Sequence, residues 1–203
     1  MVGGDLGAGR AIRSTGRGPE RQSPYMKPQH WPLYGLRLRT PRLELRLPDL
    51  ELLDELASVA ANGVHPPADM PFTVPWTDAS PAECGKAVFQ HVLATVANWS
   101  VRDWALSLAV LHEDKVVGRQ DLMAKDFAVT GEVGTGSWLG LAHQGQGIGT
   151  EMRAAALHLA FAGLGARTAV SSAMTDNPRS LASRAGSAIC RTGWRWPRCG
   201  ALP

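Results

Sequence analysis

The sequence predicts an α/β fold of the α+β kind, in which helices flank a mixed β-sheet. Segments in which apolar and polar residues alternate, as they do in half-buried strands, are interspersed with segments of helical period. Three consecutive strands are separated only by short connections, which favours antiparallel neighbours, whereas the last strand follows a helix. A helix between two strands of one sheet forms a crossover that leaves them parallel, so both kinds of strand pair are expected.

The N-terminal half is expected to supply one strand and two helices. The expected order is a strand over 36–47, a helix over 48–62, a proline-rich loop over 64–76 and a helix over 80–98. The leucines of the strand alternate with charged residues on either side of a break at Thr40-Pro41. Gly63 ends the first helix, and Ser80 has the character of an N-cap for the second, with proline at the first helical position.

The C-terminal half is expected to supply four strands and two helices. The expected order is a hairpin of strands over 104–111 and 115–124, a strand over 132–141, a helix over 147–162, a strand over 168–174 and a helix from Pro178. Ile148, Met152, Ala155 and Leu159 follow one another at steps of four, three and four, which places them on one apolar helix face. No element is expected after about Ala182.

Length and composition indicate one domain with some chain left over. The chain has 203 residues, of which 44% are apolar and 19% charged, so it can bury a core. Its longest mostly apolar run, 154–166, is too short to span a bilayer, and no secretory signal is visible, so we expect a cytoplasmic protein without a membrane partner. Three cysteines without metal-ligand spacing predict neither a disulfide framework nor a bound metal.

Residues 1–30 are expected to form a disordered basic tail rich in glycine and arginine. Five basic residues stand there against two acidic ones. Such a tail could tether nucleic acid. It could equally be a leader without function, or the result of a start codon assigned ahead of Met26. Tyr25 is the only aromatic residue near the arginines, so a platform for stacking bases is not expected and a nucleic-acid partner is disfavoured.

A glycine-rich segment, 138–150, passes directly from a predicted strand into a predicted helix. Glycines there permit positive φ, and the free N–H groups at a helix N-terminus can surround a pyrophosphate. The alternative is a tight strand-to-helix connection with no ligand. The sequence lacks the Gly-Lys-Ser/Thr ending of a P-loop and the early βαβ unit of a dinucleotide-binding fold.

The segment Gln144-Gly145-Gln146-Gly147-Ile148-Gly149 resembles the Gln/Arg-x-x-Gly-x-Gly signature of the GNAT acyltransferase superfamily. The order of elements is similar as well. Leu38–Leu43, Gly136–Gly140 and Asp176–Leu181 resemble the branch that includes the ribosomal-protein N-terminal acetyltransferases. Met70–Trp76 resembles a Met-Pro-Phe-x-Val-Pro-Trp loop of an actinobacterial group within that branch. The resemblance covers about 26–182 and implies a GNAT-like mixed sheet flanked by helices.

The resemblance implies a site for an acyl-coenzyme A co-substrate. The residues that it assigns to cofactor binding are Leu139, Leu141, Gln144, Gly145, Gln146, Gly147, Ile148, Gly149, Thr150 and Asn177. Backbone N–H groups of 144–149 would hold the pyrophosphate, and the strand edge at Leu139 and Leu141 would pair with the pantetheine arm. Asn177 would reach that arm or simply cap a helix, and Thr150 would contact a phosphate or only fill the first helical turn.

The family chemistry is direct attack of an amine on the thioester, so no cysteine is expected to act as a nucleophile. Glu132 is the expected general base, and its alternative is a solvated residue near a turn. Ser180 is the expected proton donor to the thiolate, and its alternative is an ordinary residue of a helix start. The usual family acid is a tyrosine in or after the last helix, which this sequence lacks. His65 could face the acceptor site or be solvated.

The donor is expected to be acetyl- or succinyl-coenzyme A, since the loop 64–76 is similar to that of succinyl-transferring relatives. A succinyl carboxylate would need a cation, and the candidates are Arg39, Arg42, Lys86 and Arg102. The acceptor would be a small-molecule amine or a protein N-terminal or lysine amine. The sequence leaves open whether the protein forms a homo-oligomer. It also leaves two other functions open: acyl-coenzyme A binding without turnover, and nucleic-acid association through the tail.

The similarity to the family sequence stops near Ala182, so we expect an acyltransferase domain over 31–182 and a tail unlike the family over 183–203. Read one base earlier, codons allowed by Ser183–Gly193 can spell Val-Ser-Arg-Arg-Leu-Gly-Tyr-Leu-Pro-Asp-Gly, which resembles the family continuation. We therefore expect a frame-shifted C-terminus that lacks the last two family strands, a product less stable than full-length relatives and prone to aggregate, and poor order over 185–203.

Overall fold

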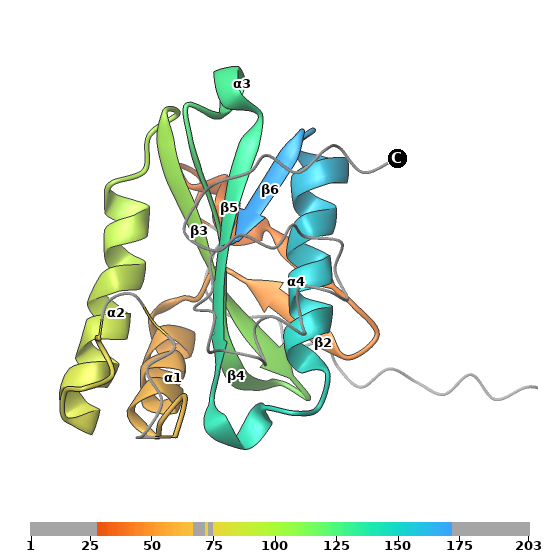
Figure 1. The fold of residues 1–203 in the computed structure, drawn as a ribbon. Helices are drawn as coiled ribbons and strands as arrows, with labels where there is room; N and C mark the ends of the chain where they lie inside the picture. The colour runs from red at the N-terminus through yellow and green to blue at the C-terminus, as the bar shows by residue number, and fades with distance from the viewer. Residues whose placement is uncertain (1–27, 67–71, 73–74, 172–203) are drawn as a thin grey trace, which may run out of the picture.

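The computed structural model describes residues 28–66, 72 and 75–171 (Figure 1). Most of the expected basic tail, the strand residues beyond Ser171, the helix from Pro178 and the tail over 183–203 lie outside these residues. Within the described residues, no helix combines the length and apolar character needed to cross a membrane.

A six-stranded sheet forms the centre of the molecule, with its strands in the order β1-β2-β3-β4-β5-β6. The strands are β1 (Arg37–Arg39), β2 (Leu43–Arg46), β3 (Asp103–His112), β4 (Lys115–Lys125), β5 (Glu132–Leu139) and β6 (Thr168–Ser171). All neighbours are antiparallel except β5 and β6, which are parallel. The predicted mixed sheet is confirmed, and its one parallel pair is the pair joined through a helix.

Helices cover both faces of the sheet (Figure 1). They are α1 (Leu50–Ala61), α2 (Pro81–Ala97), the single turn α3 (Phe127–Thr130) and α4 (Ile148–His158), with shorter turns η1 (Pro32–Gly35), η2 (Leu141–His143) and η3 (Leu159–Gly163). The helices α1 and α2 pack on one face around Leu53, Leu56 and Val92, and α4 packs on the other with Ile148 and Met152. Each face therefore has its own apolar layer.

The ends of α1 and α2 follow from local capping. The side chain of Asp49 accepts a hydrogen bond from the N–H of Leu52, so Asp49 is the N-cap of α1. Ser80 and Glu83 form a reciprocal capping box at the start of α2. Both helices begin within two residues of the predicted positions.

Two strand expectations need correction. The predicted first strand is a hairpin, β1 and β2, because the chain reverses at Thr40 and Pro41; Thr40 closes the turn by accepting the N–H of Leu43 on its hydroxyl, at 2.9 Å. The strand predicted over 132–141 ends at Leu139, since η2 begins at Leu141. The alternating pattern shows which residues are extended, but not where an extended segment turns back.

Candidate active site

The glycine-rich segment connects the end of β5 to the start of α4. Gly145 and Gly147 have φ of +76° and +77°, which non-glycine residues rarely adopt, and Gly147 is the N-cap of α4. The carbonyl of Gly147 accepts the N–H groups of Thr150 and Glu151. Within the described residues, the N–H groups of 145–149 have no backbone acceptor. These groups, at the positive end of a helix, form an arrangement suited to an anion.

Gln144 fastens this segment in place. Its side-chain amide donates to the carbonyl of Leu139 at 2.9 Å and to that of Val64, after α1, at 2.7 Å. Its backbone N–H donates to the carbonyl of Leu141 at 3.4 Å. The prediction that the Gln144 N–H faces the pyrophosphate therefore needs correction, because η2 uses that group and the side chain has the structural role.

β6 accompanies β5 over only part of its described length. β5 pairs with β6 only from Glu132 to Thr135, and no described residue pairs with the segment 136–139 on that side. Leu139 is the last residue of this segment. Leu141, also predicted to offer a strand edge, lies in η2 instead, and its N–H donates to the carbonyl of Gly63 at 3.0 Å. The strand-edge prediction for Leu141 is therefore wrong.

A clamp of three side chains joins the β1–β2 turn to the first turn of α4. Glu151 accepts hydrogen bonds from Thr40 at 2.6 Å and from Arg42 Nε at 2.7 Å. Arg42 Nη1 also donates to the carbonyl of Gln146 at 3.1 Å. Burial alone would raise the pKa of Glu151, but the hydrogen bonds from Thr40 and Arg42 outweigh it and hold this pKa below its ordinary value. An acidic residue in the first turn of a helix is visible in the sequence, but its partners 109 and 111 residues away are not.

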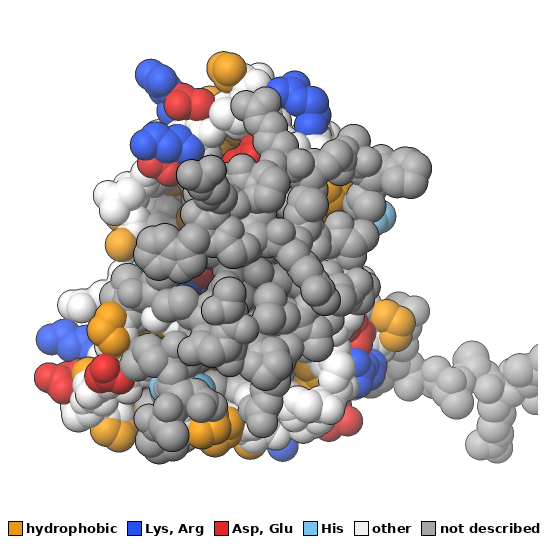
Figure 2. Space-filling model, in the orientation of Figure 1, with side chains coloured by type: hydrophobic (Ala, Val, Ile, Leu, Met, Phe, Trp, Pro, Cys, Tyr) orange, Lys and Arg blue, Asp and Glu red, His pale blue; other side chains and the backbone are white. Residues whose placement is uncertain are grey.

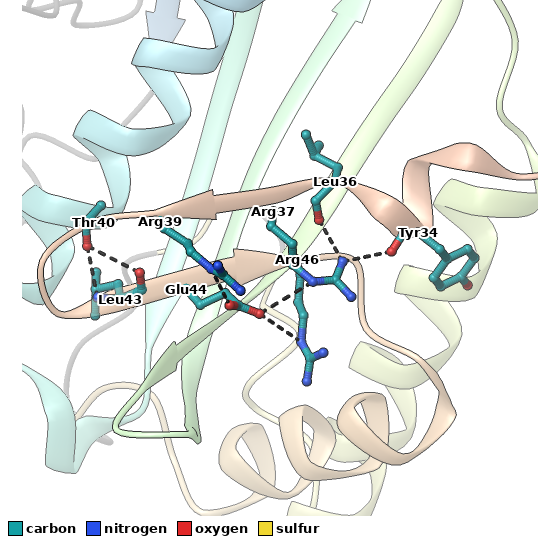
Figure 3. A network of polar contacts seen from close by, with 8 residues as sticks. All are labelled: Tyr34, Leu36, Arg37, Arg39, Thr40, Leu43, Glu44 and Arg46. Carbon is teal, nitrogen blue, oxygen red and sulfur yellow. Dashed lines mark hydrogen bonds and ion pairs between the residues drawn. The ribbon is translucent and has the colours of Figure 1, made fainter. Parts of the chain in front are cut away.

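Arg42 is the one predicted cation that contacts the glycine-rich segment in the described structure. A Cβ at Gly147 would lie 3.5 Å from Arg42 Nη2. Arg39 pairs with Glu44, which Arg37 and Arg46 also approach (Figure 3). Arg102 pairs with Asp126, and Lys86 is exposed on α2.

Two of the remaining predicted site residues lie within the described structure, and two lie outside it. Thr150 lies in the first turn of α4, half-buried. Glu132 begins β5, about 23 Å along the strand from Leu139 at about 3.3 Å per residue, and its catalytic role stays a prediction. Ser180 and Asn177 lie outside the described residues.

An aromatic row lies at the end of β5, on the α1 and α2 side of the sheet. Trp76 and Trp138 have ring centroids 5.9 Å apart, and Phe72 lies 5.2 Å from Trp76. His65 packs edge-on against Phe72, while its two ring nitrogens lie 2.8 Å from the carbonyl of Pro66 and 2.7 Å from the hydroxyl of Thr77. His65 is thus half-buried and hydrogen-bonded within the loop, not simply solvated.

Sequence reasoning missed a charged pair next to this row. Arg119 Nη2 lies 2.9 Å from Asp121 Oδ2, and both side chains are nearly buried. The Arg119 guanidinium also lies 5.9 Å from the ring centre of Trp138. Both residues of the pair lie on β4, two positions apart, so strand periodicity could have placed them on one face but not shown that the face was buried.

Three comparisons with known proteins bear on this arrangement. A family model described as an acetyltransferase (GNAT) domain matches residues 42–186. The structure is similar to RimJ of Mycobacterium smegmatis in complex with a coenzyme A disulfide, with a TM-score of 0.60 and 17% identity over 73% of this chain and 71% of that one. It is also similar to RimL, the ribosomal L7/L12 α-N-protein acetyltransferase, in complex with coenzyme A, with a TM-score of 0.56 and 21% identity over 74% and 82% of the two chains.

A third solved structure broadens this likeness. The microcin C7 self-immunity acetyltransferase MccE, in complex with acetyl-coenzyme A and AMP, matches with a TM-score of 0.53 and 19% identity over 73% of this chain and 78% of that one. At such identities the likeness to solved structures concerns the fold, whereas the family match covers most of the chain.

Proposed function

Because the chain belongs to the GNAT acetyltransferase family, we propose that it transfers an acetyl group from acetyl-coenzyme A to a primary amine by direct attack on the thioester. The observation that carries the proposal is the segment 145–149 at the start of α4, whose backbone N–H groups have no backbone acceptor in the part of the chain that the structure describes. Similar proteins bind coenzyme A or acetyl-coenzyme A in their solved structures.

Different residues of this chain bind different parts of the donor. The backbone of Gly145, Gln146, Gly147, Ile148 and Gly149 binds the pyrophosphate, Thr150 adds a hydroxyl, and Arg42 adds positive charge beside it. The edge of β5 over 136–139, with which no described residue pairs, binds the amides of the pantetheine arm as an added strand would. Asn177 completes this binding from the chain after β6.

Glu132 and Ser180 are the proposed general base and general acid. Direct attack needs a neutral amine and a proton for the departing thiolate. Glu132→Gln and Ser180→Ala are each expected to lower kcat while leaving the affinity for acetyl-coenzyme A unchanged. Near-parental single-turnover rates in both variants would remove both residues from the mechanism.

Acetyl is the donor group that the described charges favour. Arg39, Arg42 and Arg102 are each paired with a carboxylate, so a succinyl carboxylate would compete with Glu44, Glu151 or Asp126 for them. Succinyl-coenzyme A remains the alternative donor, through Lys86 or an exchange of one of these pairs. The proposed acceptor is a small molecule or a protein N-terminal or lysine amine, as RimL, named for acetylating a ribosomal protein, exemplifies. A cytoplasmic location, a domain over 31–182 and a frame-shifted segment after Ala182 complete the proposal.

A thermal-shift panel combined with a thiol-release assay tests this function. Acetyl-coenzyme A should raise Tm, since a ligand that binds only the folded protein stabilises it by about 1.4 kcal/mol for each tenfold excess over Kd. Amines should then release free thiol from acetyl-coenzyme A. Stabilisation without thiol release over a broad amine panel would indicate an acyl-coenzyme A binding protein, an alternative favoured by the absence of a tyrosine after Tyr34. A larger rise in Tm with succinyl-coenzyme A than with acetyl-coenzyme A would identify succinyl-coenzyme A as the donor.

Nucleic-acid association has less support. Figure 2 shows positive and negative side chains lying next to one another around the rim of the drawn face, without a single-sign stripe among the described atoms. Binding through the tail would be steeply salt-dependent and would vanish on removal of 1–25.

A further inference from the structure

The peptide between Gln146 and Gly147 lies in the middle of the glycine-rich segment, and the two residues that it joins do not fix its direction. Gly147 has a φ of +77°. Glycine adopts positive and negative φ about equally readily, so turning this peptide over costs little conformational energy at Gly147. Such a turn would exchange the directions of the Gln146 carbonyl and the Gly147 N–H. A contact from outside the segment can therefore decide between the two directions.

Arg42 makes such a contact. Its Nη1 donates to the carbonyl oxygen of Gln146 at 3.1 Å. The described part of the chain contains no cis peptide bond. In a trans peptide the carbonyl and the following N–H point in opposite directions. The N–H of Gly147 therefore points away from Arg42, and no described backbone carbonyl accepts it.

The next peptide takes its direction from α4 itself. The carbonyl of Gly147 accepts the N–H groups of Thr150 and Glu151. By the same trans geometry, the N–H of Ile148 points out of the N-terminal end of the helix. Gly147 is left-handed and Ile148 begins the right-handed α4, and successive residues of opposite hand bring their N–H groups around one concavity that suits an anion. The contact from Arg42 thus decides whether the Gly147 N–H joins that concavity.

The guanidinium of Arg42 is itself held in place. Glu151 Oε2 accepts from Arg42 Nε at 2.7 Å and lies 2.6 Å from Nη2. Glu151 Oε1 accepts from the hydroxyl of Thr40 at 2.6 Å and from the backbone N–H of Arg42 at 3.2 Å. Because Glu151 shares the charge of this guanidinium, Arg42 attracts an anion less strongly than an unpaired arginine would. Its hold on a backbone carbonyl is then the more important contribution.

We propose that Arg42 is a positioning residue of the donor site, which holds the Gln146 carbonyl so that the N–H of Gly147 is directed at the pyrophosphate of coenzyme A. This inference rests on the proposed function, in which the backbone of 145–149 binds that group. The direction of one peptide in the glycine-rich segment is then set from the β1–β2 turn, 104 residues earlier in the chain. The planar fork of a guanidinium suits this task, since it donates to Glu151 and Gln146 at once.

The first test keeps the charge and removes the fork. In calorimetric titration of the full chain, Arg42→Lys should bind coenzyme A about tenfold more weakly, as for the loss of one charge-assisted hydrogen bond. Arg37→Lys is the matched control, because Arg37 Nη1 also donates to backbone carbonyls, those of Tyr34 and Leu36, beside the carboxylate of Glu44 (Figure 3). This control should bind as the parent does. Parental affinity in Arg42→Lys, or an equal loss in both variants, overturns the inference.

The amide resonance of Gly147 supplies a readout that a mere loss of stability would not change. In amide correlation spectra, coenzyme A should move the Gly147 amide proton of the parent downfield, because this proton then donates to a phosphate oxygen. In Arg42→Lys saturated with coenzyme A the shift should be much smaller. A variant that has only lost stability would show the parental shift once it is saturated. The parental shift in saturated Arg42→Lys therefore overturns the inference even where affinity has fallen.

A double-mutant cycle tests whether Arg42 acts through this peptide. Gly147→Ala disfavours positive φ and should weaken coenzyme A binding by itself, although its Cβ would lie at an ordinary 3.5 Å from Arg42 Nη2. Since both changes act on one peptide, Arg42→Lys should weaken binding less than about twofold when Gly147→Ala is already present. Effects that multiply, as those of independent changes do, overturn the inference.

Transfer kinetics separates this inference from the proposed function. Arg42→Lys should raise KM for acetyl-coenzyme A about tenfold and leave kcat and KM for the amine unchanged. An unchanged KM for acetyl-coenzyme A overturns the role of Arg42 while acyl transfer stands. The Gly147 shift in the parent and its loss in Arg42→Lys, without thiol release by any amine, support the role of Arg42 and overturn acyl transfer. Failure of the parent to bind coenzyme A overturns both.

Discussion

Two arginines, the buried Arg153 and the largely buried Arg119, lie on opposite faces of the same sheet, and their described partners differ. On the α4 face, Arg153 is 4% exposed and donates to the hydroxyls of Ser137 on β5 and Ser171 on β6, at 3.2 and 3.3 Å. On the opposite face, Arg119 is paired with the carboxylate of Asp121. Arg153 thus links β5 to β6, and these two hydroxyls are among its partners. The described partners of Arg153 are hydroxyl groups, whereas the described partner of Arg119 is a carboxylate.

The largest effect is expected at the ion pair between Arg119 and Asp121. Arg119→Ala leaves the buried Asp121 carboxylate without its cation, so the free energy of unfolding should fall by about 3 to 5 kcal/mol. Denaturant unfolding at neutral pH measures it. Arg102→Ala, which removes the exposed partner of Asp126, is the matched control and should change stability little. Equal effects in the two variants would mean that burial does not distinguish the pairs.

The next effect concerns the backbone of the donor site. Gly149→Glu puts a carboxylate at the second residue of α4, which the helix dipole tolerates but a pyrophosphate would not, so affinity for coenzyme A should fall by at least about 100-fold. Ala154→Glu adds the same charge on an exposed position of α4 and should bind normally. Calorimetric titration with coenzyme A compares them. Parental affinity in Gly149→Glu would contradict the assignment of the glycine-rich segment.

A smaller effect is expected at the clamp between the β1–β2 turn and α4. Glu151→Gln weakens the hydrogen bonds from Thr40 and Arg42 and should lower stability by about 1 to 2 kcal/mol at neutral pH. The pKa of Glu151 is lower in the folded protein, so its contribution is present above about pH 4.5 and is lost as the pH falls through the folded pKa. Unfolding curves of parent and variant should therefore converge in acid. A stability gap that stays constant with pH would exclude this ionisation as its source.

The smallest effect is expected at a hydroxyl partner of Arg153. Ser137→Ala removes one of the hydroxyl partners of Arg153 but leaves that of Ser171, so stability should fall by only about 1 kcal/mol. Denaturant unfolding again measures it. A loss as large as that in Arg119→Ala would show that both faces depend equally on a single partner.

The fold and half of the site followed from the sequence for a physical reason. Strand period, helix caps and the glycine signature are local properties, and they predicted β3 to β6, α1, α2 and the start of α4 within a few residues. The reversal between β1 and β2 was missed because the alternating pattern does not show it. Thr40 and Leu43 close the turn with three hydrogen bonds, two through the threonine hydroxyl and one between backbone groups. The extent of the strand before the glycines was also missed, so Leu141 was misplaced.

The other half of the site depends on strand register, which no local pattern reveals. Asp121 faces Gly136 and Arg119 faces Trp138 only because β4 and β5 pair in one particular alignment. In the same way, Glu151 meets Thr40 and Arg42 across more than 100 residues of chain. The sequence predicts groups that act through the backbone, and it is silent on side chains that different strands bring together.

The side-chain amide of Gln144 connects the end of β5 to the chain after α1. Gln144 lies at the start of the glycine-rich segment, and its side chain also donates to the carbonyl of Val64, after α1. If a bound donor moves the Gln144 side chain, its hydrogen bond to Val64 transmits that movement to the chain after α1, and donor binding is then coupled to any binding that depends on that segment. Linkage makes that coupling reciprocal: the factor by which donor changes acceptor affinity equals the factor by which acceptor changes donor affinity. Gln144→Ala should therefore reduce both factors equally.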